Sequence, residues 1–172
     1  MSPLEVLLQD PHGWDGVIFC APVFTVLDNA RPSRLRLFAY GLLVGPVMPQ
    51  RNIKGNVFHG PEKAKIVWMN PRRFQLPARI GTMRQLMVLC DIFKRRCAKI
   101  STAFLVLHGT GDTCTSHEDS QMPYDKATSS NKTIKLYDVL YRLLLQAELK
   151  ENSERVYIDI WAWIDAQILA TQ

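Results

Sequence analysis

The chain contains no uninterrupted run of 18 apolar residues, so its pattern predicts no transmembrane helix. Its first residues lack a basic segment followed by an apolar one, so they do not read as a signal peptide. No internal repeat and no low-complexity segment occurs. The four cysteines (Cys20, Cys90, Cys97 and Cys114) form no C-x-x-C pair. We therefore expect reduced thiols in a cytoplasmic protein.

The composition that remains is that of an ordinary folded domain. The 172 residues are 47% hydrophobic and 22% charged, which indicates one globular domain. The net charge of +5 is concentrated locally, and residues 94–99 (KRRCAK) form its densest cluster. Such a cluster suits an anionic membrane or nucleic acid, but a short run offers few phosphate contacts. We interpret it as the solvated face of a helix and expect no nucleic-acid partner.

Three short segments are predicted to be strands. Residues 17–21 (VIFCA) and 104–107 (FLVL) are continuously apolar, as strands buried on both faces are, and residues 133–137 (TIKLY) form the third. Helices are predicted between and after them, over residues 83–97, 116–128, 141–148 and 152–169. This alternation predicts an α/β fold with about three parallel strands and crossover helices. Residues 23–99 form a loop-rich insertion of the kind that serves as a lid.

The last predicted helix is amphipathic. Tyr157, Ile160, Trp161, Ile164 and Ile168 follow helical spacing and are assigned to its buried face. Trp163 is assigned to the exposed side.

The segment 103–112 (AFLVLHGTGD) holds the strongest site candidate. Because chemistry in parallel sheets lies beyond the carboxyl ends of the strands, Asp112 on its glycine turn is well placed for it. His108 is expected to pack or hydrogen-bond at the strand end. Two other readings are weaker. A metal cluster drawn from six nearby residues fits no zinc spacing, and a Cys114 nucleophile has only His117 close by as a base. These six are His108, Asp112, Cys114, His117, Glu118 and Asp119. We expect no cofactor and no metal.

Several motifs, in order along the chain, resemble one family. They are LFAYGLL at 37–43, NPRR at 70–73, GTMR at 81–84, LHGTGD at 107–112, YDKA at 124–127, KLY at 135–137 and EN at 151–152. Together they resemble the C-terminal portion of the α/β-hydrolase fold in the plant monoacylglycerol lipase and caffeoylshikimate esterase group, with a serine aminopeptidase S33-type domain. The resemblance implies that residues 1–172 are a single partial α/β-hydrolase domain in which residues 23–99 are the lid.

The resemblance also implies roles for individual residues. Such enzymes use a Ser-Asp-His triad with the serine in a G-x-S-x-G turn. Asp112 matches the triad acid. Arg142 occupies the histidine position, Val139 replaces a glycine, and no G-x-S-x-G occurs in the chain. Since arginine stays protonated, it cannot be a general base. We therefore expect a serine carboxylic-ester hydrolase relative that is inactive as given, with an Asp112–Arg142 salt bridge if the two loops meet.

Partners are also implied by the resemblance. The intact family is expected to take acylglycerol or phenolic-ester substrates, with peripheral membrane contact through the lid. Residues 17–21 are expected at an open sheet edge, because the family's neighbouring strand lies upstream. An open edge favours self-association or pairing with a full-length relative. A non-catalytic binding or regulatory remnant, and a partial gene model, are therefore the alternatives to an enzyme.

Overall fold

The computed structural model describes residues 3–25, 80–146 and 148–171, together with residues 33, 35, 38–39, 62, 65–66 and 69–72. Most of the predicted lid, and with it the expected membrane contact, lies outside these residues. Within them, no helix is both long and apolar enough to cross a bilayer.

The described part of the chain is built on one sheet of three parallel strands in the order β1-β2-β3. These strands are β1 (Val17–Cys20), β2 (Phe104–Gly109) and β3 (Lys132–Tyr137). Every residue of the central β2 is buried, which explains its continuous apolar sequence. The predicted α/β architecture is confirmed, with each strand end displaced by at most two residues.

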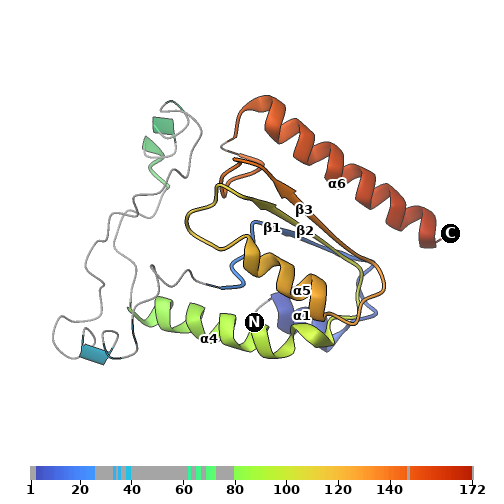
Figure 1. The fold of residues 1–172 in the computed structure, drawn as a ribbon, viewed down its shortest axis with the longest axis horizontal. Coiled ribbons are helices and arrows are strands. Elements are labelled where there is room, and N and C mark those ends of the chain that lie inside the picture. The colour runs from blue at the N-terminus through green and yellow to red at the C-terminus, as the bar shows by residue number, and fades with distance from the viewer. Residues whose placement is uncertain are drawn as a thin grey trace.

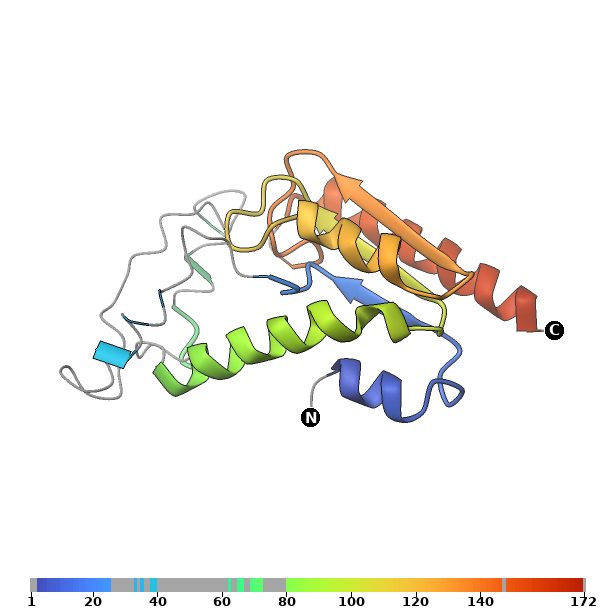
Figure 2. The same cartoon turned by 60° about the horizontal axis from the view of Figure 1, so that its bottom comes forward.

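Helices cover both faces of the sheet (Figure 1). One face carries α1 (Pro3–Gln9), α4 (Ile80–Arg96), the 3-10 turns Cys97–Lys99 and Glu118–Ser120, and α5 (Gln121–Lys126). The other face carries α6 (Lys150–Thr171), and Figure 2 shows the sheet between the two layers. Phe104 and Val106 of β2 pack with Phe24 and Phe93 on the first face, whereas Leu105 and Leu107 pack with Val156 on the second. Because successive side chains of β2 point to opposite faces of the sheet, this one strand contributes to a hydrophobic core on each face.

One helical prediction is wrong, and another holds over only part of its range. Residues 141–148 form turns and loop at the described positions. The amide of Tyr141 donates to Glu148 Oε1 at 2.5 Å, which ties the two ends of this segment together. The helix predicted over 116–128 is shorter: α5 begins only at Gln121, after the Glu118–Ser120 turn. There the hydroxyl of Ser116 accepts the amide N–H of Asp119 at 3.2 Å, which starts the turn.

The buried face of α6 also differs from the prediction. Val156 is fully buried, and Ile160 and Trp163 pack with it against β2 and β3. Tyr157, Trp161 and Ile168 instead are 45%, 62% and 52% exposed. The helix carries apolar residues on both sides, so spacing alone could not say which side meets the sheet.

The edge of the sheet is formed by β1. It pairs only with β2 in the part of the chain that the structure describes. The amides of Val17 and Ala21 donate toward β2, to Ala103 O and Leu107 O. By alternation, the amides of Ile18 and Cys20 face away from β2. Within the described residues, β1 is thus the outer strand of the sheet, where residues 17–21 were expected.

Candidate active site

The site lies at the carboxyl end of β2, in residues 110–117, which we call the acid loop. This loop is tied to the loop between β3 and α6 by backbone hydrogen bonds. The Thr110 amide donates to Tyr137 O and the Gly111 amide to Leu140 O, both at 2.9 Å. The approach is so close that a Cβ on Gly109 would lie 2.1 Å from Leu140 O. These contacts bring the two loops together and place Arg142 beside Asp112.

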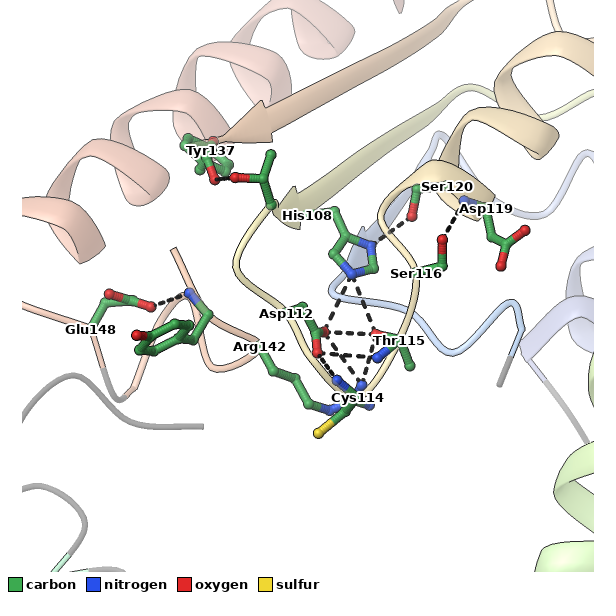
Figure 3. Close-up of polar contacts among 12 residues, drawn as sticks. His108, Asp112, Cys114, Thr115, Ser116, Asp119, Ser120, Tyr137, Arg142 and Glu148 are labelled. Atoms are coloured by element: carbon green, nitrogen blue, oxygen red, sulfur yellow. Dashed lines mark hydrogen bonds and ion pairs between the residues drawn. The ribbon is translucent and has the colours of Figure 1, made fainter. Parts of the chain in front are cut away.

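Asp112 is the centre of the site (Figure 3). Its side chain is fully buried. Oδ1 accepts the amides of Cys114 and Thr115 at 2.7 and 3.1 Å. Oδ2 accepts the Thr115 hydroxyl at 2.7 Å and lies 3.3 Å from His108 Nε2. A buried carboxylate with four such neighbours is held in its ionised form.

The electrostatics of Asp112 follow from these contacts. Burial by itself raises the pKa of the carboxyl group. The hydrogen bonds from His108, Thr115 and the backbone of Cys114 and Thr115 outweigh it and lower the pKa to about 2. Asp112 is therefore a stable anion at neutral pH.

His108 is fully buried and has neighbours at both ring nitrogens. Nδ1 lies 2.6 Å from Ser120 Oγ, and Nε2 faces Asp112. Since a carboxylate only accepts, we assign the proton to Nε2 and let Nδ1 accept from Ser120. The expectation that His108 hydrogen-bonds at the strand end is confirmed.

Ser120 is a site residue that the sequence did not mark as a candidate. Ser120 contacts His108, and His108 contacts Asp112. The three side chains therefore have the same order of contacts as a Ser-His-Asp catalytic triad. However, Ser120 and His108 are 0% exposed, so no ester can reach the hydroxyl. We read this trio as an internal scaffold for the acid loop. No local pattern in the sequence marks Ser120, because it follows β2 only after the whole acid loop.

Arg142 closes the site from the opposite loop. Its Nη1 lies 3.6 Å from Asp112 Oδ2 and donates to the Thr115 hydroxyl at 3.0 Å. The expected Asp112–Arg142 ion pair is thus present. The guanidinium side chain is 28% exposed, so it separates the buried carboxylate from solvent. The cation also lowers the pKa of Cys114, but burial and the negative charge of Asp112 raise it more.

Val139 bends the loop that carries Arg142. Its φ is +64°, a left-handed conformation that is unusual for a β-branched residue. Its amide donates to the Thr110 hydroxyl at 2.9 Å. Val139 keeps a backbone shape that suits glycine, so its side chain adds local strain.

The other residues of the proposed cluster do not gather. Among the residues that the structure describes, no three His, Cys, Asp or Glu side chains form a group suited to a metal ion. His117 directly precedes the Glu118–Ser120 turn, and its side chain makes no capping hydrogen bond there. Burial raises the pKa of the Cys114 thiol. A raised thiol pKa is the opposite of what a cysteine nucleophile needs.

Comparison with known proteins identifies the family and the fold. Residues 3–148 match the family model described as serine aminopeptidase, S33. The chain is 37% identical over 177 aligned residues to an Arabidopsis thaliana protein named caffeoylshikimate esterase, covering 98% of this chain and 53% of that protein. The chain thus spans about half the length of this curated relative.

Two solved structures share the fold. A monoacylglycerol lipase from Paleococcus ferrophilus superposes with a TM-score of 0.76 at 17% identity, covering 95% of this chain and 63% of the lipase. A soluble variant of the Saccharomyces cerevisiae monoglyceride lipase, bound to a substrate analogue, superposes with a TM-score of 0.75 at 14% identity, covering 94% and 61%.

Proposed function

Because the chain belongs to the serine aminopeptidase S33 family of α/β-hydrolases, we propose that it derives from a serine carboxylic-ester hydrolase and does not hydrolyse esters by itself. The observation that carries the proposal is the ion pair between Asp112 and Arg142. In the family's triad the acid orients a histidine that takes the proton of the nucleophile. Here a permanently protonated guanidinium stands beside the acid instead.

The surroundings of Asp112 support the same proposal. Both carboxylate oxygens already accept hydrogen bonds from the acid loop itself. A catalytic histidine would have to displace Arg142 and then find a free lone pair on Oδ2. The nucleophile has no match either, since no G-x-S-x-G turn occurs in the 172 residues. Loss of triad members lowers rates by several powers of ten.

The substrate class of the parent activity is part of the proposal. The relatives' names refer to a caffeoylshikimate ester and to monoacylglycerols. We therefore assign the intact enzymes' substrates to phenolic esters or acylglycerols. We also place the chain in the cytoplasm, which its four free cysteines support.

A p-nitrophenyl butyrate assay tests the proposal. We expect no release of p-nitrophenol by the purified chain above the rate of buffer. The Asp112→Asn and Asp138→Asn variants should give the same blank rate, the second being an exposed control in the neighbouring loop. Turnover that is lost in Asp112→Asn and kept in Asp138→Asn would overturn the proposal.

A second candidate is a non-catalytic partner role through the open edge of β1. It is favoured by the outward amides of Ile18 and Cys20, which offer a template for another strand. The partner with the matching chemistry is a full-length relative of the same family.

Capture of a tagged full-length relative by this chain tests the edge. Cys20→Pro removes one outward amide without removing a hydrogen bond to β2, so it should abolish capture. Cys20→Ser keeps the amide and should capture normally. Equal capture by both variants, or no capture by the unmodified chain, would exclude the edge as the docking surface.

A further inference from the structure

The outer face of α6 carries an apolar stripe that nothing in the described part of the chain covers. Its members are 45–71% exposed, and Figure 1 shows α6 with the sheet on one side only. We call this surface the outer stripe; it consists of Tyr157, Ile158, Trp161, Ile168 and Leu169, with Asp165 between them.

The stripe has the spacing of a helix-pairing seam. Ile158, Trp161, Asp165 and Ile168 are separated by three, four and three residues, which is the a/d repeat of coiled coils. Tyr157 and Leu169 flank this seam. The buried contacts of α6 lie on the opposite side, through Val156, Ile160 and Trp163. The outer seam is therefore additional to the packing that holds α6 on the sheet.

From this pattern we propose that the outer stripe is a self-association surface, on which α6 pairs antiparallel with α6 of a second copy of this chain. The stripe is self-complementary in that orientation. When Ile158 of one helix faces Ile168 of its partner, Tyr157 lies opposite Leu169, and Trp161 lies opposite Asp165. The first two pairs thus bring apolar side chains together, and the third sets an indole N–H donor against a carboxylate acceptor.

The size of the stripe suits a dimer. Large side chains offer roughly 150–250 Å² each when fully accessible. At the exposures given above, the stripe presents about 500 Å² in each copy, near the upper end of what monomeric proteins expose. Two stripes together would remove about 1,000 Å² from water, which is about the size that a weak biological interface needs.

The charge of α6 argues against a membrane as the occupant. The helix carries four acidic residues (Glu151, Glu154, Asp159 and Asp165) and two basic ones (Lys150 and Arg155), a net charge of 2 − 4 = −2. Helices that lie in an anionic membrane surface are instead rich in Lys and Arg. Insertion of the stripe would also bury the Asp165 carboxylate in hydrocarbon without a partner.

Sedimentation equilibrium over a concentration series tests the proposal on the whole chain. We expect a reversible monomer–dimer equilibrium. Ile158→Lys should raise the dimer dissociation constant by about 100-fold, because it places a charge in the seam. Ala166→Lys is the matched control, since Ala166 is exposed on α6 outside the stripe, and it should dimerise like the unmodified chain.

Substitutions of opposite charge at positions 158 and 168 test the antiparallel orientation of the two α6 helices. Ile168→Glu should weaken the dimer as Ile158→Lys does. The double variant Ile158→Lys with Ile168→Glu should recover most of the association, because antiparallel pairing sets position 158 against position 168 twice. A chain that stays monomeric up to about 100 µM, above typical weak dimer constants, overturns the proposal. So does a dimer that ignores Ile158→Lys, or binding to phosphatidylcholine vesicles by the monomer.

The readout is independent of ester hydrolysis. A failed esterase proposal leaves the sedimentation result unchanged, and the reverse also holds. The β1 edge is distinguished by Cys20→Pro, which should leave α6 pairing intact.

Discussion

The acid loop and the outer stripe of α6 differ in how their groups find partners. At the acid loop, the buried Asp112 and Thr115 form hydrogen bonds with each other, with His108 at the end of β2 and with Arg142. In the outer stripe, large apolar side chains such as Trp161 stay exposed. The polar groups of the acid loop already hydrogen-bond to one another, so few donors or acceptors remain to act on a substrate. Within the described residues, the exposed apolar surface of α6 has no such partners and can still bind another molecule.

The most severe test of the acid loop is Gly109→Ala. The new Cβ would lie 2.1 Å from Leu140 O, so the contact between the two loops has to open. We expect a loss on the order of 4 kcal/mol in the free energy of unfolding, or no folded protein. Gly81→Ala in α4, where nothing lies within 4 Å, should be neutral or stabilising. Urea titration followed by circular dichroism measures both, and equal stabilities would refute the close approach.

Asp112→Ala removes the acceptor around which the acid loop is arranged. The amides of Cys114 and Thr115, and the guanidinium of Arg142, would lose their partner. We expect a loss of about 3 kcal/mol in unfolding free energy. Asp138→Asn, at an exposed position, should change it by less than about 0.5 kcal/mol. A similar small change in both variants would mean that the network does not hold the loop.

The same carboxylate makes stability depend on pH. The pKa of Asp112 falls from 3.8 to about 2 on folding. A lowered folded-state pKa stabilises the protein above the unfolded pKa, and this contribution disappears as the pH falls from about 4 to about 2. We expect a loss of about 2 kcal/mol over this window. Urea titrations at pH 4.5 and 2.5 measure the unfolding free energy that is lost on acidification. This loss should be smaller in Asp112→Asn than in Asp138→Asn, and equal losses in the two variants would contradict the prediction.

Val139→Gly tests whether the loop that carries Arg142 is strained, because it should relax the backbone there. Glycine tolerates the φ of +64° that strains valine. We expect the protein to gain about 1 kcal/mol in unfolding free energy. The control Val88→Gly, at an exposed position of α4, should instead cost about 1 kcal/mol. A destabilised Val139→Gly variant would show that the turn is not strained.

The smallest expected effect is that of Ile158→Ala, measured in the dilute monomer against Val156→Ala on the other side of α6. Val156→Ala empties space beneath the helix, where Val156 is 0% exposed, and should cost about 1–2 kcal/mol. Ile158→Ala, on the outer stripe and 67% exposed, should change the unfolding free energy by less than about 0.5 kcal/mol. Thermal melts at sub-micromolar concentration provide the measurement. A larger loss in Ile158→Ala would mean that the outer stripe is part of the fold's core.

The order of elements and the position of Asp112 were determined by the sequence alone. The continuous apolar runs in 17–21 and 104–107 mark strands buried on both faces, and the glycine turn after β2 locates the acid. These signals are local, because a buried strand must be apolar along its whole length. The motifs between residues 37 and 152, which include LHGTGD at 107–112, add the family.

Only the tertiary structure decided what these residues meet. Apolar side chains on both sides of α6 fit the helical period equally well, and the sheet selected Val156 and Trp163 instead of Tyr157 and Trp161. Ser120 lies next to His108 because a turn folds back over the end of β2. Arg142 lies against Asp112 because Gly109 and Gly111 let two loops touch. Such contacts depend on distances between segments far apart in the chain, which no local pattern encodes.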